Sequence, residues 1–287
     1  MSHTHHPDNC LNCSHHLEPQ DKFCAECGQP ANTHARITLP HIGHEIVHVV
    51  THADKGFFYL IKALTLQPGL TIKEYLSGKH KKYYSPFSFF FIVLGLVVFT
   101  NSVFKPYESF NQMNSSAAGA STQLLAKKNI SEAEKQKISK KLEKLRKIDV
   151  RVAKAMHFMN TRTNIVLGIS TPFIAFVIFL LYYKRLFYAE QLSIVTFING
   201  YLNLLSVVIF SPLMYLAKGT PWYGMLLFIM MLMHIVYTAI VYHRVLDMRY
   251  SFGGYLKAAL TSLAGITGWT IVCVIVVTLY IAWGVLY

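Results

Sequence analysis

Residues 86–104 read PFSFFFIVLGLVVFTNSVF and contain no Asp, Glu, Lys or Arg. A helix of about 20 apolar residues crosses a bilayer, because the hydrocarbon core is roughly 30 Å thick and each residue adds about 1.5 Å. Four later runs share this character: Ile165–Tyr183, Leu192–Ala217, Trp222–Tyr242 and Ala258–Trp283. The sequence therefore predicts an all-α polytopic membrane protein with about five transmembrane helices.

The overall composition supports a membrane protein and excludes a single soluble domain. Apolar residues make up 53% of the 287 residues and charged residues only 14%, whereas a soluble domain carries about 25% charged residues. The formal net charge is +13, and Lys and Arg of membrane proteins collect beside the lipid headgroups. We expect the lipid bilayer, including anionic lipids, as a partner. We expect no nucleic acid, because no basic-aromatic module stands out.

The chain divides into three predicted regions. Residues 1–36 hold a His-rich tail and a cysteine module, residues 37–85 form amphipathic interfacial helices, and residues 86–287 form the transmembrane domain. A loop over 105–164 lies inside the last region. There Ser131 and Glu134 form a capping box, and apolar residues then recur every three or four positions. This pattern predicts one amphipathic helix over 131–160 that lies on the membrane or pairs with a copy of itself in a homo-oligomer.

The short loops predict the orientation. Loops 184–191 and 243–257 carry several Lys and Arg, whereas loop 218–221 carries only Lys218. Because basic loops stay in the cytoplasm, the N-terminus is expected there and the C-terminus outside, in a multi-pass protein of the inner (cytoplasmic) membrane. The loop 105–164 opposes this orientation, since it holds 13 Lys and Arg against 5 acidic residues. At about 60 residues, however, that loop reaches the length at which the rule ceases to apply.

A pair of Cys-x-x-Cys motifs predicts a metal site near the N-terminus. Cys10 and Cys13 form the first motif, and Cys24 and Cys27 form the second, followed by Gly28. Each motif makes a tight turn that directs two thiolates at one ion, and two such turns give the tetrahedral sulfur coordination of structural zinc. Disulfides are the alternative, but a cytoplasmic module without a signal peptide disfavours them. With all four positions taken by sulfur, this zinc ribbon is expected to be structural rather than catalytic.

The chain also resembles a known family, the bacterial membrane proteins grouped as domain of unknown function 3667. The resemblance rests on these stretches: Cys27-Gly28-Gln29, Pro68-Gly69, Ile72-Lys73-Glu74-Tyr75-Leu76, Gly78-Lys79 and Tyr84-Ser85-Pro86-Phe87. It implies a cytoplasmic-membrane protein with a zinc ribbon. It implies no reaction, because the family is uncharacterised. Ser14 departs from the pattern, since a second glycine often follows the first ligand pair.

Residues 44–48 match H-E-x-x-H, the signature of helical zinc proteases. His44 and His48 would bind zinc, Glu45 would activate water, and Glu74 is the downstream acid with suitable spacing for a third ligand. The local pattern favours another interpretation. His41, His44, His48 and His52 share one face of an amphipathic helix, which is a solvated face or a pH-responsive surface.

Three polar residues within the predicted spans are considered as candidates for function. His234 lies mid-span, and Asn199 and Asn203 lie one turn apart in the third span. Intramembrane polar residues are candidates for function, but hydrogen bonds between helices explain them equally well. No carboxylate occurs within the predicted spans, which disfavours a coupled ion transporter.

Three function classes follow, in order of preference. The first is a non-enzymatic scaffold, in which the zinc ribbon recruits a protein partner to the membrane. The second is a channel, a transporter or a lipid-handling protein. The third is a membrane metalloprotease that uses His44, Glu45 and His48.

Overall fold

The computed structural model describes residues 8–31, 56–104, 132–248 and 252–286. All regular elements in these ranges are helical, apart from two isolated antiparallel bridges near the N-terminus. The elements are α2 (Gly56–Leu66), α3 (Pro68–Leu76), α4 (Pro86–Phe104), α6 (Glu132–Thr161), α7 (Thr163–Tyr182), α8 (Tyr188–Leu205), the π-helical turn η2 (Ser206–Phe210), α9 (Ser211–Leu216), α10 (Trp222–Val245) and α11 (Phe252–Leu286).

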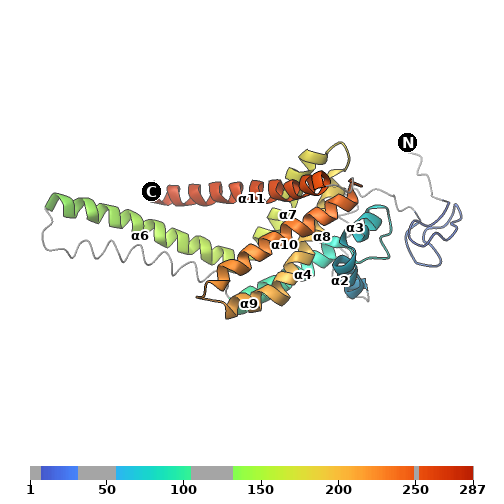
Figure 1. Ribbon diagram of the computed structural model, residues 1–287, viewed down its shortest axis with the longest axis horizontal. Helices are drawn as coiled ribbons and strands as arrows, with labels where there is room; N and C mark the ends of the chain where they lie inside the picture. The colour runs from blue at the N-terminus through green and yellow to red at the C-terminus, as the bar shows by residue number, and fades with distance from the viewer. Residues whose placement is uncertain (1–7, 32–55, 105–131, 249–251, 287) are drawn as a thin grey trace.

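Five segments are long and apolar enough to cross a membrane, which confirms the predicted fold class. They are Pro86–Phe104, Thr163–Tyr182, Tyr188–Leu216, Trp222–Val245 and Phe252–Tyr280. The protein is therefore a multi-pass membrane protein. The cysteine module lies at one end of the bundle, and α6 extends from the opposite end together with the C-terminal part of α11 (Figure 1). We call these the ribbon side and the far side.

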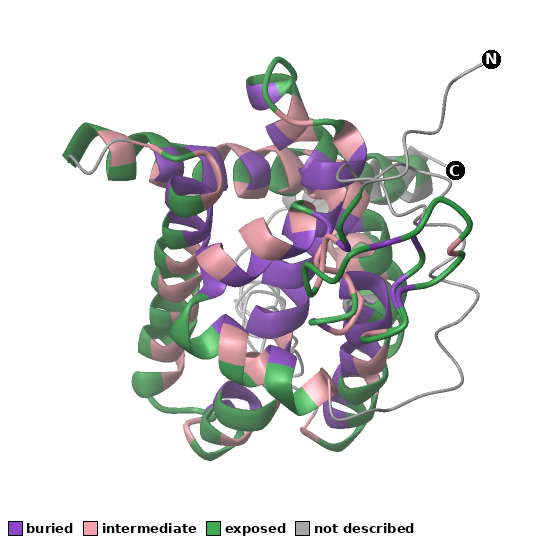
Figure 2. Cartoon of the chain, turned by 90° about the vertical axis from the view of Figure 1, so that its right-hand side faces the viewer, coloured by how far each residue is buried: buried purple, intermediate pink, exposed green. Residues whose placement is uncertain are grey.

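Helix α8 lies at the centre of the bundle, between α4 and α7. Seen from the ribbon end, buried residues gather toward the interior and exposed residues on the outer faces (Figure 2). The approach of α4 to α8 is close: a Cβ added at Gly200 would lie 2.8 Å from the Phe89 ring. A Cβ at Gly265 would lie 2.9 Å from Ile174, where α11 meets α7. Small residues permit such contacts, on which association of helices in lipid depends.

The third span differs from its predicted bounds at its start. Helix α8 begins at Tyr188, four residues before the predicted Leu192, and so includes the buried Glu190. The Glu190 carboxylate accepts a hydrogen bond from the Phe187 amide at 2.8 Å. An acidic group in the first turn satisfies a helix amide and complements the helix dipole, which explains how the span accommodates a carboxylate. Glu190 lies two residues before the run Leu192–Ala217 that the sequence predicted as the third span.

Pro212 perturbs the same span, as its position suggests. The π-helical turn Ser206–Phe210 directly precedes the α9 segment that contains Pro212. A proline ring clashes with the carbonyl four residues earlier and removes one amide donor. A wider turn relieves the clash, and π-turns are a frequent response inside helices. Pro172, in contrast, lies within α7 without interrupting it.

Helices α2 and α3 are built into the ribbon end of the bundle. Leu60, Leu64, Ile72 and Tyr75 are almost completely buried. Helix α3 packs on α10, and the Lys73 ammonium meets Asp247, in the turn after α10, at 2.5 Å. These buried side chains therefore pack against the bundle, within the segment 37–85 that the sequence predicted as amphipathic interfacial helices.

Candidate metal centre and its junction with the membrane domain

The cysteine module consists of two turns with the same hydrogen-bond pattern, displaced by 14 residues. In the first turn the Cys10 amide donates to the His15 carbonyl and the Ser14 amide to the Cys10 carbonyl, both at 2.8 Å. In the second turn the Cys24 amide donates to Gln29 at 2.8 Å and the Gly28 amide to Cys24 at 2.9 Å. Bridges Asn9–His16 and Phe23–Pro30 close the two turns in the same way.

Each turn requires a residue in the left-handed region directly after its second cysteine. Ser14 has φ of 64° and Gly28 has φ of 68°. Glycine adopts this conformation without a Cβ clash, whereas serine does so at a cost. The two turns are thus equivalent in backbone geometry although their sequences differ at this position.

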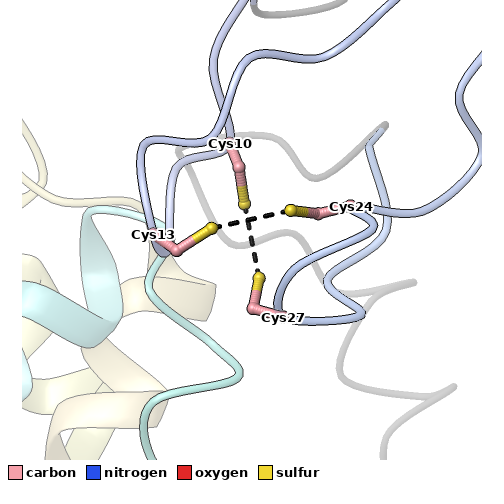
Figure 3. Close-up of side chains that lie close together, drawn as sticks. All are labelled: Cys10, Cys13, Cys24 and Cys27. Atoms are coloured by element: carbon pink, nitrogen blue, oxygen red, sulfur yellow. Dashed lines mark hydrogen bonds between the residues drawn. The ribbon is translucent and has the colours of Figure 1, made fainter.

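The two turns bring four sulfur atoms together, one pair from each turn. All four lie within 4.8 Å of one another, and none is in a disulfide. Cys10 and Cys27 are 3.6 Å apart and Cys13 and Cys24 are 3.5 Å apart, along the two crossing dashed lines in Figure 3. Four sulfurs around one point can hold a metal ion, and the structure brings together all four cysteines predicted as ligands.

The surroundings favour ionisation of one thiol. Burial opposes the charged form of Cys27, but the Gln29 backbone amide and the Cys10 thiol donate hydrogen bonds to its sulfur. The net result lowers the pKa of Cys27 to about 7. Burial raises the pKa of Cys10, whose side chain is almost fully enclosed. A bound cation would favour the thiolate form of all four.

The module is attached to the membrane domain through the side chain of Gln29, which is 1% exposed. Its Nε2 donates to the Gly78 carbonyl at 3.0 Å, and its Oε1 accepts from the Lys81 amide at 3.4 Å. Asn12 in the other turn accepts from the Lys82 amide at 3.0 Å. Both turns therefore contact the segment 77–85, which links α3 to α4. We call these three hydrogen bonds the ribbon junction.

Glu74 at the end of α3 holds this linking segment in place. Its carboxylate accepts from Lys79 at 2.8 Å and from Lys82 and Tyr83 at 2.5 Å each. These bonds lower the pKa of Glu74 to about 2. The hydrogen bond to Glu74 in turn raises the pKa of Lys82. The carboxylate predicted as a third ligand for a protease zinc is thus engaged by three other side chains.

The remaining predicted residues have different outcomes. His41, His44, Glu45, His48 and His52 lie outside the described residues. Asn199 is buried, and its amide donates to the Thr171 hydroxyl of α7 at 2.9 Å, while Asn203 donates to the Asn199 carbonyl at 2.8 Å. These contacts favour the interpretation of the span asparagines as hydrogen bonds that join and brace helices.

The ribbon junction could not have been derived from the sequence alone. Gln29 and Gly78 are 49 residues apart, and nothing local connects them. The only signal is that both residues belong to the stretches that carry the family resemblance, as does Glu74.

These features define the class: a multi-pass helical membrane protein with an N-terminal module whose four cysteines are placed so that they can hold a metal ion. Residues 54–98 match the family model described as Protein of unknown function (DUF3667), which confirms the family resemblance. The matched stretch contains α2, α3, the linking segment with Glu74 and Gly78, and most of α4. Neither the search of curated proteins nor the search of solved structures found a match.

Proposed function

We propose that the protein is a non-enzymatic scaffold of the cytoplasmic membrane, in which a zinc ribbon at the cytoplasmic end of a five-helix bundle recruits a protein partner. The observation that carries the proposal is the ribbon junction, because it links a metal-organised module directly to the membrane domain. A module held by three hydrogen bonds, of which that from Gln29 to Gly78 is buried, presents its outer surface in a defined position, as a docking platform requires.

The geometry of the four sulfurs supports zinc as the metal. A tetrahedral ion with Zn–S bonds of about 2.3 Å separates its sulfurs by about 3.8 Å. The two sulfur pairs, at 3.6 and 3.5 Å, are close to this value. Cys10, Cys13, Cys24 and Cys27 would be the ligands, and a site closed by four thiolates leaves no position for substrate. Besides the cysteines, the core of the module contains only Leu17 and Ala31, so the metal would supply its folding energy.

The outer surface of the ribbon supports a protein partner. Phe23 precedes the second cysteine pair and is 61% exposed, although it is a large apolar residue. Exposed aromatic residues are frequent anchors of protein interfaces. Phe23 belongs to the turn that carries Gln29, so a partner bound there would be held by the same junction.

Metal analysis and crosslinking test the proposal on the full chain in native membranes. We expect one zinc per chain, and none after Cys24→Ser. A photo-crosslinking residue at Phe23 should form one adduct of defined mass, whereas the exposed Gln20 should form none. Cys24→Ser should abolish the adduct. Equal labelling at both positions, or an adduct that persists without zinc, would contradict recruitment by the folded ribbon.

The orientation is tested separately by truncated fusions to a reporter that is active only in the cytoplasm. A fusion after Met248, on the ribbon side, should be active, and a fusion after Lys218, on the far side, should be silent. The reverse result would move the ribbon outside the cytoplasm, where disulfides would be expected instead of zinc.

A further inference from the structure

A large apolar groove lies at the far end of the bundle, away from the ribbon. It is formed by the C-terminal part of α6, the first turns of α7 and the C-terminal half of α11, and its volume is about 820 Å³. Figure 1 shows α6 and the C-terminal half of α11 extending beyond the end of α10. Its size falls within the range of about 300–1,000 Å³ in which proteins hold small molecules and lipids.

The walls of the groove are almost entirely hydrocarbon. Phe158 of α6, Ile169 of α7 and Val276 of α11 line it, and they are 49%, 58% and 59% exposed. The ring of Trp269 and the small side chain of Ala155 also line it. Such a surface is matched by a lipid chain, because lipid tails are as apolar as these side chains.

The rim of the groove is basic. Among the described residues that line it, Lys154 is the charged one. Arg151, one turn earlier on α6, lies over the Tyr280 ring at 5.0 Å and donates to the Tyr280 carbonyl at 3.0 Å. A guanidinium carries five N–H donors, so this contact leaves others for a second acceptor. A phosphate beside Lys154 and Arg151 would meet two cations, of which the guanidinium is held by Tyr280.

The charge of α6 decides between two occupants of the groove. The helix carries nine Lys and Arg against four acidic residues. A second copy of the chain would bring two such helices together, and the like charges would repel. An anionic lipid has the complementary charge. We propose that the groove binds a hydrocarbon chain of an anionic glycerophospholipid from the bilayer, with the phosphate of that lipid against Lys154 and Arg151.

Tryptophan fluorescence offers a direct test, because Trp269 lines the groove and the chain contains only two other tryptophans, Trp222 and Trp283. The full chain with Trp222→Phe and Trp283→Phe is placed in phosphatidylcholine vesicles. These vesicles contain increasing amounts of phospholipid with brominated chains, which quench a nearby indole. The matched control keeps only Trp222, which is exposed at the start of α10.

Brominated phosphatidylglycerol should half-quench Trp269 at a mole fraction at least about fivefold lower than brominated phosphatidylcholine, since one basic residue near the membrane contributes about that factor. At Trp222 the two lipids should quench alike.

Lys154→Glu should remove the difference between the two lipids in their quenching of Trp269. Lys140→Glu, farther along α6, should leave this difference unchanged. Ala155→Phe, which fills the groove, should remove quenching by both lipids, and Ala153→Phe, which does not line it, should leave that quenching in place.

Equal quenching of Trp269 by the two lipids would overturn the proposal. So would a preference that survives both Lys154→Glu and Ala155→Phe in variants of normal helicity. A dimer that forms without anionic lipid and is weakened by Ala155→Phe would assign the groove to a second copy of the chain instead.

Discussion

At the scale of single residues, positions 14 and 28 perform the same task with different side chains. Both have φ near +65°, directly after a cysteine pair, and both donate their amide to the first cysteine of that pair. The position requires a left-handed backbone, which costs an L-residue about 1–2 kcal/mol. Serine at position 14 therefore strains the first turn, whereas Gly28 does not strain the second.

Ser14→Gly should stabilise the metal-bound module by about 0.5–1 kcal/mol, because relief of strain exceeds the added chain entropy of glycine. Gly28→Ala should destabilise it by about 1 kcal/mol, although no atom lies within 4 Å of the added Cβ. The measurement is zinc loss from the full chain in a titration with a chelator. The chelator concentration that removes half of the zinc should rise for Ser14→Gly and fall for Gly28→Ala. Equal concentrations in the two variants would refute the strain argument.

At the scale of single elements, the bundle depends on a few close approaches and on one charged cluster. Gly200 allows α8 to contact Phe89 of α4, and Glu74 holds the segment that joins α3 to α4. Neither role is visible in the periodicity of its own helix, because each depends on a partner in another element.

Gly200→Ala should destabilise the bundle by about 1–3 kcal/mol, because the new methyl group overlaps the Phe89 ring and forces the two helices apart. Gly224→Ala is the matched control, since nothing lies within 4 Å of a Cβ at that position of α10. Thermal unfolding in detergent compares the two variants. Helix propensity alone favours alanine at both positions, so a loss at Gly200 no larger than that at Gly224 would refute the packing argument.

The Glu74 cluster predicts a pH dependence. The pKa of Glu74 is lowered from 4.5 to about 2, so the folded state favours the carboxylate. The stabilisation is complete above the unfolded pKa and is lost as the pH falls from about 4.5 toward 2. Glu74→Gln should therefore lower the midpoint temperature of unfolding at neutral pH. The difference in midpoint temperature between this variant and the parent protein should vanish by about pH 2. A difference that stays constant over this range would exclude the carboxylate as its source.

At the scale of the whole molecule, two hydrophobic cores share no residue. One contains Cys10, Leu17, Cys24 and Ala31, and the other comprises the helical bundle with α2 and α3. The ribbon junction connects them through hydrogen bonds. The cores should therefore lose their order separately.

Removal of the proposed metal should unfold the module without unfolding the bundle, because an ion held by the four thiolates would supply most of the module's folding energy and none of the bundle's. Hydrogen exchange should increase at residues 8–31 and at the Lys81 and Lys82 amides, while helicity measured by circular dichroism should remain. Restoring zinc should reverse the change. A loss of helicity on chelation would mean that the bundle requires the bound module.

The five spans, the helix after residue 131 and the four clustered cysteines were predictable from the sequence, because each depends on local properties. Transfer of about 20 apolar residues into lipid needs no tertiary contact, and a Cys-x-x-Cys turn orients its own thiols. Only the tertiary structure decided four features: the start of α8 at Tyr188, the packing of α2 and α3 on the bundle, the ribbon junction, and the groove of α6, α7 and α11. Each of these depends on side chains of distant segments meeting, and pattern within one segment carries no information about its partner.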